Sequence, residues 1–87
     1  MQFDWDENKR QTNIRKHEID FKDAVKIFSS HHMSYEDDRP IYDEQRFVAY
    51  GFWNSHLLVV VYTFVDDDII RIISARKAKK YEEKQFL

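Results

Sequence analysis

The sequence predicts an α+β fold: an antiparallel sheet of four or five strands with two N-terminal helices and one C-terminal helix. Two observations predict it. Apolar residues at helical spacing occupy Phe21–Phe28, and three apolar runs of strand length follow between residues 46 and 75. The 87 residues include one Gly and one Pro, so no flexible linker divides the chain. A chain of this length has one core, and we therefore expect a single domain over residues 1–87.

The N-terminal segment predicts a short strand and then an unusually polar helix. Phe3–Trp5 has the composition of a strand, and Asp6 can cap a helix over roughly Glu7–His17. Ile14 is nearly the only apolar residue of this helix, so packing stabilises it little unless one face has another role. At about 100° per residue, a cationic stripe with an imidazole forms along one arc: Lys9, Asn13, Lys16 and His17.

Residues 20–43 predict a second helix and two loops. Asp20 is a candidate N-cap, and apolar residues follow at the i, i+3, i+4, i+7 spacing of a core helix: Phe21, Ala24, Val25 and Phe28. Ser29–Ser34 should form a loop that leads to a short extended piece near Met33–Glu36. The second loop, Asp37–Asp43, surrounds the single proline.

Three stronger strands and a C-terminal helix complete the predicted fold. Arg46–Gly51 alternates between apolar and polar residues, and Leu57–Phe64 is apolar on both faces, which predicts a central strand. Ile69–Ala75 is apolar except for Arg71 and Ser74. The links between these runs are short enough for hairpins, so we expect an antiparallel meander. The remaining C-terminal residues have a helix-forming composition.

Composition excludes several classes of protein. Hydrophobic residues are 43% of the chain, which is enough for a core and excludes disorder as the main interpretation. The chain has no Cys, which excludes a disulfide framework, a thiolate zinc site and a cysteine nucleophile. With one Gly there is no phosphate-cradling loop for nucleotide-dependent phosphoryl transfer. No secretory signal or membrane-length apolar run is present, so we expect a cytoplasmic location and no membrane partner.

Charge is segregated along the chain although the formal net charge is only -2. Residues 36–44 are rich in acids, whereas residues 71–80 contain five basic residues and no acid. This segregation is compatible with an anionic substrate on one side of the domain and a basic partner on another.

Motifs spread over almost the whole chain occur in a distinctive order. They are WDENK at Trp5–Lys9, Asn13, the Lys16-His17 pair, FKDAVKIF at Phe21–Phe28, Arg46, Gly51, LLVVVYTF at Leu57–Phe64 and RIISARKA at Arg71–Ala78. Together these segments resemble the BrnT family of toxins from bacterial type II toxin–antitoxin pairs. The resemblance implies a RelE-like fold and an RNA-cleaving activity. It also implies a BrnA-like antitoxin as partner, with operator DNA bound only through that antitoxin.

Cleavage of RNA without a metal ion requires a base for the 2′-OH proton, an acid for the departing 5′ oxygen and cations near the phosphorane. Arg71 and Arg76 are candidates because a guanidinium fork binds phosphate oxygens. For Arg71, an ion pair with an acid such as Asp4 is the alternative, and both interpretations stay open. Arg76 is expected near a helix start beside Lys77, which favours a phosphate site. For the same reason we expect replacement of Arg76 to cost less stability than replacement of Arg71.

The polar helix and one strand supply the other candidates. Imidazole titrates near neutrality, so His17 could act as acid or base, or could bind the last carbonyls of its helix. Lys9 and Lys16 could contact RNA phosphates or form a solvated helix face. The resemblance adds Arg46, for which a surface ion pair with a neighbour such as Glu44 is the alternative.

Weaker patterns favour structural roles. The side chains of His31 and His32 diverge because the residues are adjacent, and Asp66–Asp68 fits a hairpin tip, so we expect no metal and no cofactor. Phe52 and Trp53 could stack on bases or on an antitoxin, or could pack over the edge of the core.

The sequence therefore predicts a metal-independent endoribonuclease toxin that an antitoxin neutralises. One alternative is a noncatalytic interaction module whose basic segment docks an acidic partner or operator complex. A metal-dependent nuclease that uses the acidic loop is a third interpretation.

Overall fold

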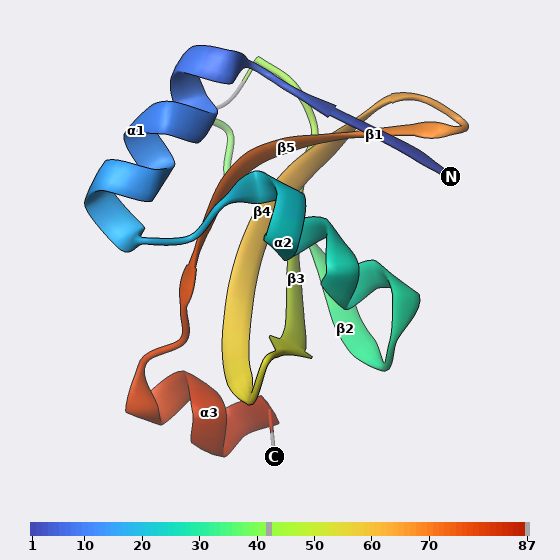
Figure 1. The fold of residues 1–87 in the computed structure, drawn as a ribbon. Coiled ribbons are helices and arrows are strands. Elements are labelled where there is room, and N and C mark those ends of the chain that lie inside the picture. Colours follow the sequence, from blue (N-terminus) through green and yellow to red (C-terminus); the bar gives the residue numbers. More distant parts are fainter. Residues whose placement is uncertain (42, 87) are drawn as a thin grey trace.

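Within residues 1–41 and 43–86, five strands and three α-helices follow one another in the order β1–α1–α2–η1–β2–β3–β4–β5–α3, where η1 is a short 3₁₀-helix (Figure 1). This computed structural model describes residues 1–41 and 43–86, so the loop expected over Asp37–Asp43 lies partly outside the described residues, at Tyr42. The bounds are β1 Gln2–Trp5, α1 Glu7–His17, α2 Phe21–Ala24, η1 Val25–Ser29, β2 His32–Asp37, β3 Arg46–Trp53, β4 His56–Asp66, β5 Ile69–Lys77 and α3 Lys80–Phe86.

The strands form one sheet in the order β1-β5-β4-β3-β2. The α+β class and the central position of β4 are confirmed, and β2 to β5 pair in antiparallel fashion as hairpin links require. The expectation of a purely antiparallel sheet is wrong at β1, which pairs parallel to β5 with Phe3 opposite Ile70. No hairpin joins β1 to β5, because the rest of the domain separates them in sequence. The rule that predicted the meander therefore did not apply to β1.

The expected second helix is shorter than its apolar pattern suggested. The α-helix ends at Ala24 and continues as η1, and the buried side chains are Phe21, Ala24 and Ile27. A spacing of three fits the three residues per turn of a 3₁₀-helix. Gly51 allows η1 to approach β3 closely, because a Cβ at this position would lie 2.8 Å from the Ile27 Cβ.

A bulge in β5 determines which of its residues face the core. The register against β4 shifts between Val61, opposite Ser74, and Tyr62, opposite Ile72, so Ile73 is an extra residue. Ile72 and Ala75 are consequently both buried in the core. Ser74 lies on the opposite face, which a regular alternation from Ile72 would have turned inward.

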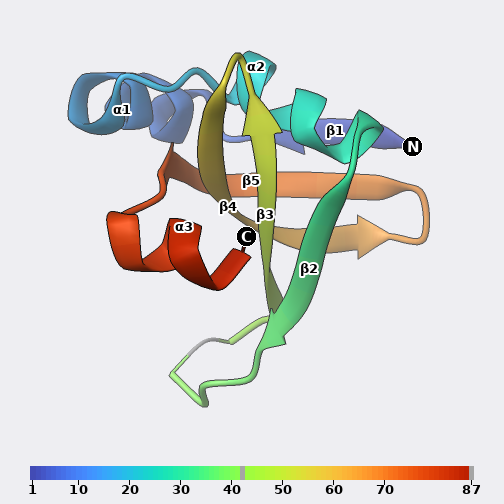
Figure 2. The ribbon, with the colours of Figure 1, turned by 90° about the horizontal axis from the view of Figure 1, so that it is seen from below.

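The two faces of the sheet have different coverings. Helices α1 and α2 with η1 pack on one face, over a core that includes Phe21, Ile27, Leu58 and Ile72. Helix α3 lies on the other face, away from α1 and α2 (Figure 2). Every second side chain of the strands points to that second face, and α3 covers only part of it. We refer to it as the open face.

Candidate active site

Three adjoining hollows contain most of the candidate residues. The sheet hollow lies on the open face, and its lining includes Tyr35, Asp37, Arg46, Tyr50, Ser74 and Arg76. The helix hollow lies between α1 and β5, and its lining includes Lys9, Lys16, His17 and Ser74. The strand-end hollow lies near the end of β1, and its lining includes Trp5, Lys9, Glu44 and Arg71. Ser74 lines the first two hollows and Lys9 lines the last two, so neighbouring hollows share lining residues.

Arg76 is held by a bidentate ion pair with Glu82 of α3. Its Nη1 donates to Glu82 Oε1 at 2.8 Å and its Nη2 donates to Oε2 at 2.9 Å. A third bond runs from Nη1 to the Lys77 carbonyl at 3.3 Å. The side chain of Arg76 is nevertheless 35% exposed, so the guanidinium group reaches the surface of the sheet hollow. The sequence placed Arg76 at a helix start, whereas it lies in β5 and α3 begins only at Lys80.

Glu82 is a buried carboxylate that joins three elements. In addition to Arg76, it accepts a hydrogen bond from the Lys79 backbone N–H at 2.8 Å and one from the Tyr50 hydroxyl at 3.2 Å. The hydrogen bonds from Arg76 lower the pKa of Glu82 to about 2, against the opposing effect of burial. Glu82 is therefore ionised near neutral pH, and it fixes both Arg76 and the Tyr50 hydroxyl.

Arg46 lies in the same hollow as Arg76. It stands opposite Asp37 in the register of β2 and β3, and its Nη2 lies 3.4 Å from Glu44 Oε1. Asp37 pairs with Arg39 at 2.7 Å, and this bond keeps the pKa of Asp37 below its usual range. Each candidate arginine of the sheet hollow therefore lies near a carboxylate: Arg46 near Glu44 and Asp37, and Arg76 near Glu82.

Arg71 makes the ion pair that the sequence offered as its alternative. Its Nε and Nη2 donate to the two carboxylate oxygens of Asp4, each at 3.0 Å, and the two residues are neighbours in the parallel register. The Asp4 bond raises the pKa of Arg71. Half of the Arg71 side chain is exposed, whereas Glu82 is buried against Arg76. This contrast reverses the expected order of stability costs, because breaking a buried pair is the more destabilising change.

The stripe of α1 faces β5, and its members have different surroundings. All four residues line the helix hollow, and Asn13 alone among them is buried. Lys77 is exposed at the end of β5. Because consecutive strand residues point to opposite faces, Lys77 does not share the sheet hollow with Arg76.

Sequence reasoning missed Tyr35, Tyr50 and Glu82 as site residues. The alternation of β3 was a usable signal for Tyr50, since it lies four residues after Arg46 on the same face. For Glu82 the signal was its match to a Glu of the C-terminal helix in the family that the sequence resembles, but charged residues are rarely buried, so a site role was not expected. Burial raises the pKa of the Tyr50 phenol, which therefore keeps its proton near neutral pH.

Two further observations concern metal and membrane chemistry. Within residues 1–41 and 43–86, no three His, Asp or Glu side chains gather in a group suited to a metal ion. None of the helices in this part of the chain has the length and apolar composition required to cross a bilayer.

Comparison with known proteins identifies the family. Residues 5–82 match the family of the ribonuclease toxin BrnT of type II toxin–antitoxin systems. Among solved structures, the crystal structure of the Brucella abortus ribonuclease toxin BrnT is 34% identical in sequence, with a TM-score of 0.70 and coverage of 92% of this chain and 99% of that one. No curated protein matches this chain. Since the family match spans β1 to α3 and the solved structure has the same fold, this chain belongs to the BrnT family of ribonuclease toxins.

Proposed function

We propose that this toxin cleaves RNA without a metal ion and that the sheet hollow is its active site. The observation that supports this most is the shared hollow of Arg46 from β3 and Arg76 from β5, with the protonated phenol of Tyr50 beside them. Two guanidinium groups match the negative charge that develops on a phosphorane. The Tyr50 hydroxyl adds a third donor when its single O–H turns from Glu82 to the phosphate.

The proposed reaction is an internal transesterification. The 2′ oxygen of one nucleotide attacks the adjacent phosphorus, and the bond from phosphorus to the 5′ oxygen breaks. The products are a 2′,3′-cyclic phosphate and a 5′-hydroxyl end, so the 2′-OH proton is removed and one proton is added to the leaving oxygen. His17 is our candidate for one of these transfers because imidazole titrates near neutral pH. It lines the helix hollow, which shares the lining residue Ser74 with the sheet hollow.

The basic residues of α1 would contact the RNA on either side of the cleaved bond. Lys9 and Lys16 line the helix hollow, and their ammonium groups suit contacts to backbone phosphates on either side of the cleaved bond. Arg71 already forms a bidentate pair with Asp4, so we assign it a structural role with at most a secondary phosphate contact.

Glu82 positions Arg76 in this proposal. The three hydrogen bonds to Glu82 and Lys77 use three of the five N–H groups of a guanidinium, which leaves donors for a phosphate oxygen. With its pKa near 2, Glu82 is too weak a base to accept the 2′-OH proton.

The family membership supports an antitoxin partner. We propose that a BrnA-like antitoxin neutralises this toxin in the cytoplasm by covering the sheet hollow, and that the complex reaches operator DNA only through the antitoxin. Acids on the contacting element of the antitoxin would complement the exposed cations at the least desolvation cost.

Incubation of purified toxin with RNA in excess EDTA tests the proposal. We expect cleavage to continue and to leave 2′,3′-cyclic phosphate ends. Cleavage that stops in EDTA and returns with magnesium would reject metal independence. A matched reaction with antitoxin added should show no cleavage.

One observation favours a second candidate, a noncatalytic interaction module. The fork of Arg76 already holds a carboxylate, in the way that it would hold an acidic side chain of a partner. Folded toxin that binds its antitoxin but leaves RNA intact under all conditions would support this second candidate.

A further inference from the structure

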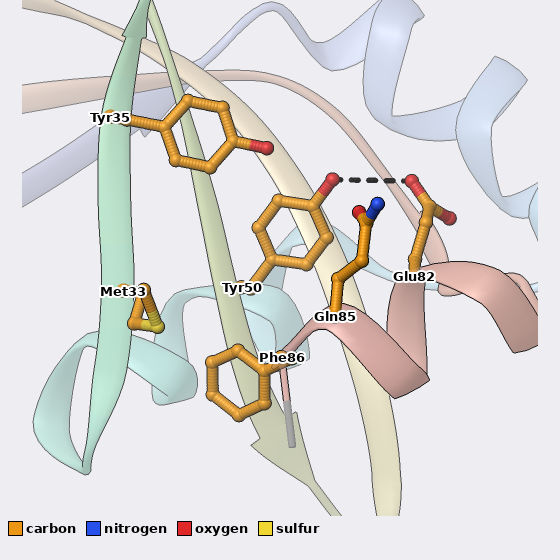
Figure 3. Close-up of a pocket in the computed structure, with 6 residues that line it drawn as sticks. All are labelled: Met33, Tyr35, Tyr50, Glu82, Gln85 and Phe86. Atoms are coloured by element: carbon orange, nitrogen blue, oxygen red, sulfur yellow. Dashed lines mark hydrogen bonds between the residues drawn. The ribbon is translucent and has the colours of Figure 1, made fainter.

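A stack of aromatic rings borders the sheet hollow between β2, β3 and α3 (Figure 3). The ring centroids of Tyr35 and Tyr50 are 5.7 Å apart with planes at 21°, and those of Tyr50 and Phe86 are 6.4 Å apart with planes at 20°. With Met33 and Gln85, these rings line a cavity of about 350 Å³, counting the space open to solvent. We call these five residues the aromatic shelf.

The shelf presents an apolar surface to solvent. Tyr35 and Met33 are each 52% exposed, although both are large apolar or aromatic residues. Phe52 packs against the ring of Phe86 with a centroid distance of 5.7 Å, which supports the lower end of the stack. Flat, exposed aromatic rings in a nearly parallel arrangement are the surface on which nucleobases stack.

The shelf adjoins the proposed phosphate site. Tyr35 and Tyr50 line both the aromatic cavity and the sheet hollow. The Tyr50 hydroxyl bonds Glu82, and Glu82 in turn holds Arg76. A phosphate bound by the arginines of the sheet hollow would therefore bring a neighbouring base within reach of the shelf.

We infer that the aromatic shelf binds one unpaired nucleobase of the RNA substrate, next to the cleaved phosphate. The inference rests on the proposed function, and it specifies the substrate as single-stranded RNA. A base in an A-form duplex is already stacked and paired, so its faces cannot reach the shelf. The amide of Gln85 at the rim of the cavity provides a donor and an acceptor for the edge of the base.

Binding of a short single-stranded 2′-O-methyl RNA tests the inference without requiring cleavage. Stacking on one aromatic side chain contributes about 1–3 kcal/mol, so Tyr35→Ala should weaken binding roughly 5- to 150-fold. Tyr35→Phe keeps the ring and should bind within about 2-fold of the parent protein. Tyr81→Ala removes an exposed tyrosine of α3 outside the shelf and should bind like the parent.

A fluorescent base gives a second readout. We expect 2-aminopurine placed at one position of the oligonucleotide to be quenched on binding, and Tyr35→Ala to remove the quenching. Duplex RNA should bind equally to the parent and to Tyr35→Ala.

The outcomes separate this inference from the proposed function. If parent and Tyr35→Ala bind single-stranded RNA equally, the shelf is not a base site, even where the parent cleaves RNA in EDTA. If Tyr35→Ala loses antitoxin binding alone, the shelf is a protein contact and the inference is overturned. A parent that binds RNA through Tyr35 but does not cleave it upholds the shelf and rejects the catalytic proposal.

Discussion

Asn13 bonds both backbone groups of Ala75 with one side chain. Its Nδ2 donates to the Ala75 carbonyl oxygen at 2.8 Å, and the Ala75 N–H donates to its Oδ1 at 3.1 Å. Strand β1 pairs with β5 only as far as Trp5 opposite Ile72, so Asn13 satisfies backbone groups that lie beyond the end of β1. The same Nδ2 also donates to the Ile19 carbonyl oxygen at 2.8 Å. This buried amide explains how a helix with few apolar residues stays attached to the sheet.

Asn13→Ala should therefore destabilise the protein strongly. The substitution leaves three buried backbone groups without their Asn13 partner, and each such group costs about 1–3 kcal/mol. We expect the free energy of unfolding, measured by urea titration, to fall by at least about 3 kcal/mol. Asn8→Ala changes an exposed residue of the same helix and should stay within about 0.5 kcal/mol of the parent. Equal stabilities of the two variants would contradict this account.

The pH dependence of stability should include a contribution from Glu82. Its pKa falls from 4.5 to about 2 on folding, so between these values the unfolded state binds the proton more readily. The contribution is complete above pH of about 4.5 and is lost as the pH falls through about 2, and its size is on the order of 3 kcal/mol. Glu82→Gln should flatten the loss of stability over this window in acid titrations followed by circular dichroism. Glu83→Gln alters the exposed neighbour, and a curve identical to that of Glu82→Gln would refute the assignment.

The fold was predictable where local pattern determines structure. The apolar faces of β4 identified a central strand, and Asp6 was correctly expected to cap α1, since its carboxylate accepts bonds from the N–H groups of Asn8 and Lys9. The parallel pairing of β1 was not predictable, because it depends on a contact between residues 2–5 and residues 69–72, which are far apart in sequence. Periodicity also could not separate an α-helix from the 3₁₀-helix η1, because buried residues three positions apart fit either kind of helix.

The candidate site was likewise predictable only where local sequence pattern determines the structure. Arg71 and Arg76 looked alike in sequence, and at five residues apart they would occupy opposite faces of a regular strand. The bulge at Ile73 interrupts that alternation. The two arginines nevertheless line different hollows, where Arg71 pairs with Asp4 and Arg76 pairs with Glu82. Neither the bulge nor the burial of Glu82 leaves a mark in the spacing of residues. Both result from tertiary packing.

The two arginines should consequently differ in their effects on cleavage. Loss of a donor to developing charge costs roughly 100-fold in rate, which we expect for Arg76→Ala. Arg71→Ala removes a half-exposed ion pair, which contributes little to stability, and should lower cleavage by less than roughly 10-fold. Lys84→Ala removes the same charge from exposed α3 and controls for general electrostatic attraction.

Stability must be checked alongside those rates, because Arg76→Ala leaves the buried Glu82 carboxylate without its cation. Arg76→Lys keeps the charge but loses the bidentate fork, and it should retain the fold while cleaving more slowly than the parent. Equal rates for the Arg76→Lys, Lys84→Ala and parent proteins would remove Arg76 from the proposed active site.

The Tyr50 hydroxyl should contribute to catalysis without titrating in the working range. Burial raises the pKa of this phenol, so near neutral pH it keeps its one proton, which it donates to Glu82 and would turn toward the phosphate beside the two arginines of the sheet hollow. Tyr50→Phe keeps the ring of the aromatic shelf and removes only the oxygen. We expect a 10- to 100-fold fall in the single-turnover cleavage rate, the range of about 1.4–2.7 kcal/mol for a lost donor.

Binding of a noncleavable single-stranded RNA to Tyr50→Phe should stay within about 2-fold of the parent protein, because stacking is preserved. The shape of the pH–rate profile below pH 9 should also be unchanged, since the group lost does not ionise there. Tyr81→Phe is the matched control on an exposed tyrosine. A Tyr50→Phe protein that cleaves at the parent rate would limit Tyr50 to holding Glu82 and the aromatic stack, whereas loss of RNA binding together with rate would place its hydroxyl in substrate binding instead of the chemical step.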